Sequence, residues 1–180
     1  MRIFLFLAEG FEEIEAIAPV DIFRRAGIEV TTVSITDNLL VTGAHNVGVQ
    51  ADTVFSKADF SGDYLIYLPG GMPGTLNLDN HSGLKKLIET QLNKGKKVAA
   101  ICAAPSILGK MGALKNKEAV CYPGFESQLT GARIPQAKIA KSDNILTAKG
   151  PGVAIPFALK IVEELKGKQV AEEVAAAMIL

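Results

Sequence analysis

The chain has 180 residues, of which 48% are hydrophobic, so it is long and apolar enough to bury a core, and wholesale disorder is excluded. Its 19 Lys and Arg residues balance 19 Asp and Glu residues, and this zero net charge argues against a nucleic-acid-binding protein. No apolar run approaches the ~20 residues that span a bilayer, and the stretch 3–7 is too short for a signal-peptide core. We therefore expect a single domain over residues 1–180, located in the cytoplasm and with no membrane partner.

Strand-like and helix-like segments alternate along the first third of the chain. The continuous apolar run at 3–7 predicts a strand that is buried on both faces. Helical spacing of apolar residues then predicts a helix over 11–25, and β-branched residues predict a strand over 28–35. Two short apolar runs, 39–41 and 47–49, flank a turn and predict a small hairpin.

The same alternation continues to the end of the chain. Further strands are expected at 64–68, 97–101, 117–121, 138–140 and 145–147. Further helices are expected at 84–92, 105–111, 153–165 and 169–178. Strands that alternate with helices predict an α/β sandwich around a mostly parallel sheet, in which ligands bind beyond the carboxyl ends of the strands.

The first candidate site residue is Cys102, which lies between the expected strand 97–101 and a helix that begins at Pro105. A cysteine in such a turn resembles a nucleophile elbow, and the helix N-terminus that follows favours a thiolate by lowering the thiol pKa. A buried and inert cysteine is the equally open alternative. Cys121 has no such context, and we expect it to be inert.

The second candidate is the pair Gly70 and Gly71, which follows the expected strand 64–68. Consecutive glycines let backbone N–H groups point at an anion. Beside a cysteine nucleophile, the amides of Gly71 and Ala103 can form an oxyanion hole. An ordinary tight turn is the alternative, and the glycine pair alone favours that simpler interpretation.

The third candidate is Glu15, one of several acidic residues after the first strand. At about 100° per residue, Glu15 lies on the edge of the apolar helix face, whereas Glu12 and Glu13 project away from it. Pro19 has no N–H to donate to the carbonyl of Glu15, so the helix is irregular there. A half-buried carboxyl has a raised pKa and, when protonated, can donate a hydrogen bond to a neighbouring thiolate.

The histidines and cysteines of this chain do not suggest a metal centre. His45, His81, Cys102 and Cys121 are the only imidazole and thiol groups, and no CxxC, HxxxH or HExxH spacing occurs. We therefore expect no metal and no cofactor. Both histidines are expected to be solvated, His45 in the hairpin turn and His81 at a helix entrance.

Taken together, these residues resemble a known family. Its motifs are matched in order and spacing at 8–15, 19–21, 24–27, 68–71, 100–105 and 150–152. These blocks resemble the DJ-1/PfpI (ThiJ/PfpI) superfamily, and most of all its DJ-1-like branch of protein and nucleotide deglycases and "thiazole monophosphate biosynthesis" proteins. The resemblance covers essentially the whole chain. It implies a flavodoxin-like three-layer sandwich, a homodimer, and a reactive elbow cysteine that can be oxidised to a sulfinate.

The resemblance assigns roles to individual residues. Cys102 takes the place of the nucleophile and Glu15 that of the acid in contact with it, while the amides of Gly71 and Ala103 are the donors. Gly70 and Tyr122 are candidates for orienting a substrate oxygen.

Two positions depart from the family pattern. Peptidase-like members carry a histidine directly after the cysteine, where this chain has Ala103, so peptidase and amidotransferase activities lose their base. The deglycase branch often has a histidine before a proline, and here Tyr122 precedes Pro123. A phenol with an ordinary pKa of ~10 is a poor general base near neutral pH.

Two functions from different classes therefore stay open. In the first, the Cys102 thiolate adds to a small reactive aldehyde such as methylglyoxal, and Glu15 moves a proton. This gives glutathione-independent glyoxalase or deglycase activity, on aldehydes or on glycated proteins and nucleotides, in the carbonyl and oxidative stress response. In the second, oxidation of Cys102 is itself the signal of a redox sensor or redox-regulated chaperone. Tyr122 in place of histidine shifts weight toward the second function.

Overall fold

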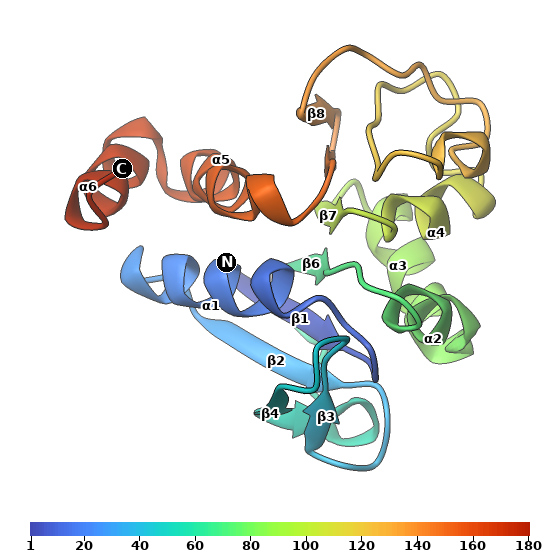
Figure 1. Ribbon diagram of the computed structural model, residues 1–180, viewed down its shortest axis with the longest axis horizontal. Coiled ribbons are helices and arrows are strands. Elements are labelled where there is room, and N and C mark those ends of the chain that lie inside the picture. The colour runs from blue at the N-terminus through green and yellow to red at the C-terminus, as the bar shows by residue number, and fades with distance from the viewer.

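The computed structural model describes all 180 residues as a sheet covered on both faces by helices (Figure 1). Seven strands form the sheet in the order β5-β2-β1-β6-β7-β9-β8. Their bounds are β1 Arg2–Leu7, β2 Val30–Ser34, β5 Thr53–Val54, β6 Tyr64–Leu68, β7 Val98–Ile101, β8 Ile139–Ser142 and β9 Ile145–Ala148. All neighbouring strands are parallel except β8, which pairs with β9 in the antiparallel direction.

The strand order identifies the fold. Without the two-residue edge strand β5, the parallel strands β2, β1, β6, β7 and β9 lie in the order 2-1-3-4-5 when numbered along the chain, which is the flavodoxin-like order. The expected flavodoxin-like sandwich with a mostly parallel sheet is thus confirmed. Strand order reverses between β1 and β6, and this reversal is where open α/β sheets bind their ligands.

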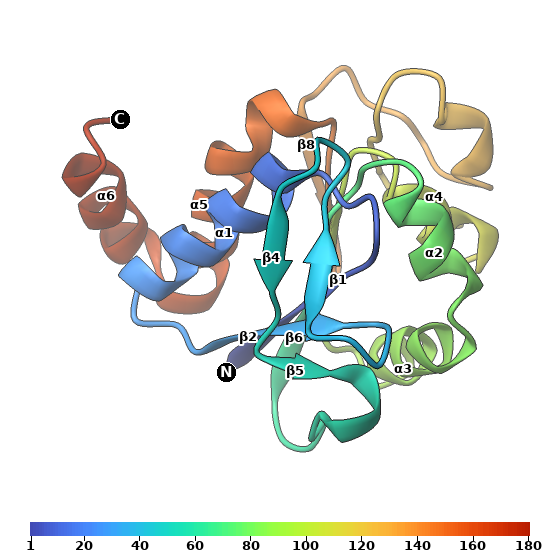
Figure 2. The ribbon, with the colours of Figure 1, turned by 60° about the horizontal axis from the view of Figure 1, so that its bottom comes forward.

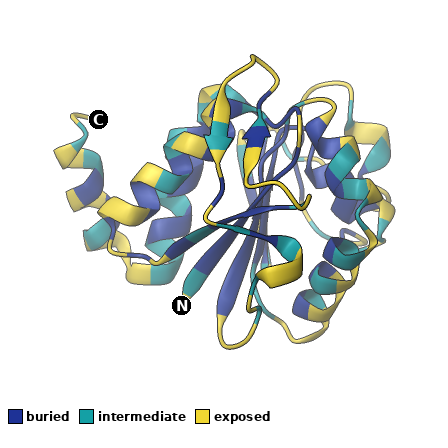
Figure 3. Ribbon diagram, turned by 90° about the horizontal axis from the view of Figure 1, so that it is seen from below, coloured by how far each residue is buried: buried dark blue, intermediate teal, exposed yellow.

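Six helices form the outer layers (Figures 1 and 2). They are α1 Glu13–Arg25, α5 Ala154–Lys166 and α6 Lys168–Ala177 on one face, and α2 Gly74–Asn80, α3 Ser82–Asn93 and α4 Pro105–Lys110 on the other. A hydrophobic core lies on each face of the sheet, and β1 contributes to both because its side chains alternate. Ile3, Leu5 and Leu7 pack under α1 and α5. Phe4 and Phe6 pack under α2 and α3. Figure 3 shows the buried strands between helices whose outer sides are exposed.

A separate two-stranded hairpin lies beside α1 (Figure 2). It consists of β3 Leu40–Thr42 and β4 Gly48–Gln50, which pair in the antiparallel direction as the sequence predicted. Short 3-10 helices complete the chain at Phe55–Lys57, Glu126–Gln128 and Pro151–Val153. None of the helices combines the length and the apolar character that crossing a membrane requires.

Most expected elements are confirmed within a few residues, but one expected strand is absent, and one helix and one strand were not expected. The expected strand at 117–121 is absent: Glu118 forms one isolated bridge with Arg133, and the Val120 N–H donates to a side chain, Thr147 Oγ1, at 2.9 Å. The sequence also missed α2, because its glycine-rich start reads as a turn, and β5, which has only two residues.

Candidate functional site

Cys102 occupies the turn between β7 and α4 in a strained conformation. Its φ is +65°, in the left-handed region that residues with a Cβ rarely adopt. Hydrogen bonds fix both of its peptide groups, since the Cys102 N–H donates to the Ala148 carbonyl at 2.9 Å and the Cys102 carbonyl accepts from the Tyr122 N–H at 2.7 Å. The residue is buried, with 9% of its surface exposed. This is the geometry of a nucleophile elbow.

Gly70 brings Cys102 and Glu15 together. A Cβ at Gly70 would lie 2.6 Å from the Cys102 Cβ and 2.7 Å from Glu15 Oε2, so these two side chains flank the glycine closely. Gly70 also donates its N–H to Glu15 Oε2 at 2.8 Å. The structure therefore gathers Glu15, Gly70 and Cys102, which follow β1, β6 and β7, at the carboxyl ends of the strands.

Glu15 is buried more deeply than its position on the helix predicted. Its side chain is inaccessible to solvent, and Oε1 is buried without a well-formed hydrogen bond. Burial raises the pKa of Glu15 to about 7, although hydrogen bonds with the Gly70 amide and the Cys102 side chain act in the opposite direction. Near neutral pH the carboxyl can therefore both give and take a proton.

Cys102 does not have the lowered pKa that the following helix N-terminus led us to expect. Burial raises the pKa of the thiol to about 12, and the negative charge of Glu15 adds to this effect. Hydrogen bonds from the Gly71 and Ala103 amides lower the pKa but are outweighed, and α4 has only six residues. Because burial opposes both charges and each charge repels the other, the two groups are not both ionised near neutral pH.

The amides of Gly71 and Ala103 are the two donors that face Cys102. Gly71 has a φ of +90°, which a glycine tolerates at no steric cost. The space that a side chain at Gly71 would need is also occupied, because a Cβ there would lie 2.6 Å from the Gly10 carbonyl oxygen. Only glycine therefore presents its N–H to the sulfur at this position.

Tyr122 lies beside the elbow and is 46% exposed. Its ring contacts Gly150, where a Cβ would lie 3.1 Å from Tyr122 Cδ2. With Lys138, Lys149 and Pro151 it lines a pocket of about 250 Å³. Tyr122 is thus partly exposed, and its main-chain N–H binds the Cys102 carbonyl.

Cys121 is set apart from this site. It is buried in the core beneath α3 and α4, whereas Cys102 belongs to the core beneath α1 and α5. Burial raises the pKa of its thiol to about 11. Neither cysteine forms a disulfide.

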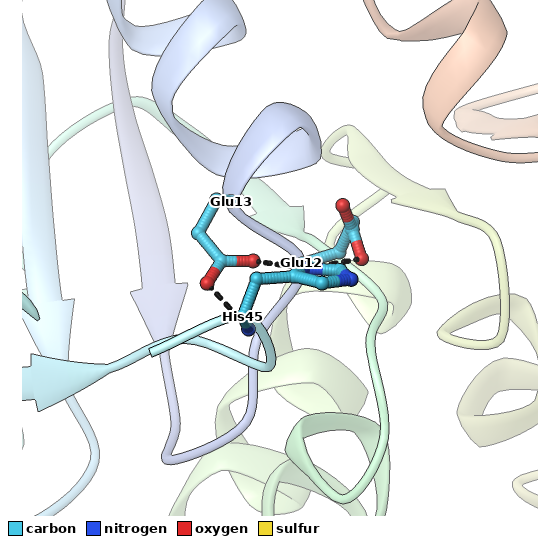
Figure 4. A group of neighbouring side chains, drawn as sticks. All are labelled: Glu12, Glu13 and His45. Atoms are coloured by element: carbon cyan, nitrogen blue, oxygen red, sulfur yellow. Dashed lines mark hydrogen bonds and ion pairs between the residues drawn. The ribbon is translucent and has the colours of Figure 1, made fainter. Parts of the chain in front are cut away.

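The sequence did not predict the contact between Glu13 and His45, which Figure 4 shows. Glu13 was expected to project away from the apolar face of the helix, and there it is buried under the hairpin: its Oε1 accepts the His45 N–H at 2.7 Å, and its Oε2 lies 2.8 Å from His45 Nδ1. His45 is exposed as expected, yet it is tied to Glu13. The two residues are 32 positions apart, so no local pattern indicates their contact.

These residues also form the one cluster whose donor atoms could surround a metal ion. The donor atoms of Glu12, Glu13 and His45 lie within 4.8 Å of one another. Glu13 already accepts hydrogen bonds from the hairpin, however, since the Val47 N–H approaches its Oε1 as well, at 3.4 Å. Attachment of the hairpin accounts for this cluster without an ion.

Comparisons with known proteins agree with the geometry. A family model described as the DJ-1/PfpI family matches residues 1–164. The solved structure "Toxoplasma gondii DJ-1, oxidized" is 36% identical, with a TM-score of 0.94 and coverage of 99% of this chain and 97% of that one. "Glutathione-independent glyoxalase DJ-1" of Schizosaccharomyces pombe is 29% identical in an alignment of 177 positions that covers 93% of each chain.

Two relatives from Arabidopsis thaliana are longer proteins. "Protein DJ-1 homolog B" is 35% identical over 99% of this chain, and "Protein DJ-1 homolog A" is 37% identical over 97%. The chain spans 41% and 45% of their respective lengths. The family model, the fold and the gathered site residues lead to one conclusion: the chain belongs to the DJ-1/PfpI family.

Proposed function

We propose that this protein is a cysteine-dependent enzyme that acts on small reactive aldehydes, as a glutathione-independent glyoxalase does. The observation that carries the proposal is the placement of Cys102 in a left-handed elbow, flanked by the buried carboxyl of Glu15. A relative that covers almost the whole chain bears the name of this activity, which supports the choice of substrate class.

The reaction on methylglyoxal proceeds in three steps that need no external oxidant or reductant. The sulfur of Cys102 bonds to the aldehyde carbon, and the thiol proton passes through Glu15 to the aldehyde oxygen, giving a hemithioacetal. Glu15 then takes the proton from this carbon and returns it to the neighbouring carbon, while the hydroxyl proton on the first carbon moves to the carbonyl oxygen of the second, which gives the thioester of lactate. Water cleaves the thioester, so that methylglyoxal and water become lactic acid and the thiol is restored.

The surrounding groups have distinct roles in this scheme. The amides of Gly71 and Ala103 stabilise negative charge that develops beside the sulfur. Glu15 needs a pKa near the working pH because it gives and takes protons in turn, and burial supplies such a pKa. The exposed phenol of Tyr122 orients a substrate oxygen at the edge of the site. Repair of glycated proteins or nucleotides extends the same chemistry to larger carbonyl adducts.

A redox sensor or redox-regulated chaperone is the second candidate. The exposed side chain beside the elbow is Tyr122, which offers no imidazole base for rapid turnover, and this favours a thiol whose oxidation is the signal. Either function belongs in the response to carbonyl and oxidative stress. Free Cys102 and Cys121 support a reducing compartment, the cytoplasm.

We further propose that residues 1–180 act as one domain and form a homodimer. Both hydrophobic cores share one sheet, which supports the single domain. Exposed apolar side chains on α1 and the neighbouring hairpin support a second copy as the partner on this side of the molecule. They are Ile14, Ile17, Leu40 and Val47.

Turnover of methylglyoxal, followed as lactate formed, tests the proposed activity. We expect wild type and Cys121→Ala to be active and Cys102→Ala to be inactive. In parallel, mass spectrometry after peroxide treatment should show oxidation at Cys102 before Cys121, because Cys102 is 9% exposed and Cys121 only 2%. Lactate formation by Cys102→Ala contradicts the enzyme, and selective oxidation of Cys102 in a wild type that forms no lactate favours the sensor instead.

A further inference from the structure

A hydrogen bond from Tyr67 takes the place of one that helix α1 cannot make. Pro19, inside α1, has no N–H, so the Glu15 carbonyl loses its ordinary helical donor four residues ahead. This carbonyl belongs to a fully buried residue. The hydroxyl of Tyr67, on β6, donates to it at 3.0 Å.

The position of Tyr67 is fixed by its surroundings. Its side chain is fully buried, and its ring packs edge-on against Phe23 at 5.8 Å and tilted against Phe157 at 6.0 Å between centroids. Burial, with the charge of Glu15, raises the pKa of Tyr67 far above its ordinary value. The hydroxyl therefore keeps its proton, and with it its role as donor, throughout the accessible pH range.

Glu15 is thereby attached at both ends to one short segment of chain. Tyr67 binds its main-chain carbonyl at 3.0 Å, and three residues later Gly70 binds its carboxyl at 2.8 Å. Gly70 in turn lies against both Glu15 and Cys102, since a Cβ at Gly70 would lie within 2.7 Å of each side chain. Segment 67–70 thus fixes both the position of the Glu15 main chain and the direction of its carboxyl.

We propose that Tyr67 is a positioning residue for the proposed reaction: its hydroxyl replaces the helical N–H that Pro19 removes, and so holds the Glu15 carboxyl against Cys102. This inference rests on the proposed function in treating Glu15 as the proton carrier. The alternative is that Tyr67 only fills the core with its ring, in which case the hydroxyl has no influence on Cys102.

The test measures the rate of Cys102 alkylation by iodoacetamide against pH, in proteins that carry Cys121→Ala. Tyr67→Phe removes the hydroxyl and keeps the ring. Tyr64→Phe is the matched control, since Tyr64 lies on the same strand but packs in the opposite core. Pro19→Ala combined with Tyr67→Phe restores a helical N–H for the Glu15 carbonyl.

We expect Tyr67→Phe to shift the midpoint of the alkylation profile downward, because a loosened Glu15 raises the thiol pKa less. Turnover of methylglyoxal should fall about fivefold in kcat, the change that one ordinary hydrogen bond corresponds to, with KM nearly unchanged. Tyr64→Phe should match wild type in both measurements. The double variant should recover most of the wild-type profile.

Coinciding profiles for Tyr67→Phe, Tyr64→Phe and wild type overturn the inference. If Tyr67→Phe does not fold, the double variant decides, because its failure to fold shows that an N–H at residue 19 cannot replace the hydroxyl. A wild type without turnover removes the proposed enzyme but not this test, since alkylation reports on Glu15 and Cys102 directly.

Discussion

The buried carboxyl of Glu15 makes the stability of the protein depend on pH. Burial raises its pKa from 4.5 to about 7, so its contribution to stability is fully present below the unfolded pKa and is lost as pH rises through the folded one. Because Glu15→Gln cannot titrate, we expect the unfolding free energy of wild type relative to this variant to fall by about 3 kcal/mol between pH 4.5 and 8. Urea unfolding at several pH values measures the difference, and parallel stability curves contradict it.

The same substitution separates the two roles of Glu15. Its charge and hydrogen bond raise the pKa of Cys102, so Glu15→Gln should lower the thiol pKa by about one unit. Lactate formation should nevertheless disappear, since an amide cannot carry a proton. The thiol pKa is read from the absorbance of the thiolate, and turnover is measured on the same sample. An unchanged thiol pKa shows that Glu15 and Cys102 do not interact.

Gly70 is a further position where one methyl group should affect the site. In Gly70→Ala the new Cβ lies 2.6 Å from Cys102 Cβ and 2.7 Å from Glu15 Oε2, so one of the two must move. Such overpacking costs about 1–3 kcal/mol of stability, and we expect alkylation of Cys102 to change with it. Gly152→Ala is the matched control, because nothing lies within 4 Å of its Cβ. Equal melting temperatures for the two variants would refute the prediction.

The site residues differ in how well the sequence alone predicts them. Cys102, Gly71 and Glu15 each follow a strand in a recognisable local pattern, so the rule for parallel sheets suffices to bring them together. Tyr67 looks like any buried strand residue, since its role depends on a carbonyl 52 positions away. The raised pKa of the Cys102 thiol was not predicted for the same reason: the depth of burial at Cys102 comes from packing that local sequence does not encode.

At the scale of elements, the contact between α1 and the hairpin depends on Glu13. Burial pushes the pKa of Glu13 up, but hydrogen bonds from His45 and Val47 outweigh it and leave the pKa lowered. The ionised carboxylate thus stabilises the hairpin above its unfolded pKa, and this stabilisation is lost as the pH falls through the folded pKa.

Substituting Glu13 should release this hairpin from the helix. In Glu13→Gln we expect faster hydrogen exchange at the His45 and Val47 amides and a loss of about 1–3 kcal/mol, the cost of weakening buried hydrogen bonds. Glu12→Gln is the control, because Glu12 lies 3.7 Å from the His45 ring and its side chain binds no hairpin amide. Exchange rates that stay at wild-type values in Glu13→Gln rule out this role.

Elements were predictable where their apolar periodicity was strong and long. The strand at 64–68 was predicted to the residue, and α1, α3, α5 and α6 to within two residues at each end. β5 is too short to show a period. The segment 117–121 has the composition of a strand but forms only one isolated backbone bridge, with Arg133, and bonds to the Thr147 side chain. Tertiary contacts decide such cases.

For the whole molecule, the apolar surface on α1 and the hairpin predicts self-association. We expect light scattering to give twice the monomer mass for wild type, and the monomer mass for Ile14→Asp, since Ile14 is 53% exposed within this proposed interface. Ile179→Asp is the control, because Ile179 is equally apolar and 95% exposed near the other end of the chain. A monomeric wild type, or a dimer that survives Ile14→Asp, disproves this interface.

The left-handed backbone at Cys102 has a consequence for how the sequence can evolve. A residue with a Cβ costs about 1–2 kcal/mol in that conformation, and glycine relieves this cost. The backbone conformation therefore favours mutation toward glycine at this turn, whereas the packing of the Cys102 side chain in the core and the need for a sulfur atom oppose it. If Cys102 is the nucleophile that we propose, the thiol marks a position where selection for chemistry outweighs a cost in folding.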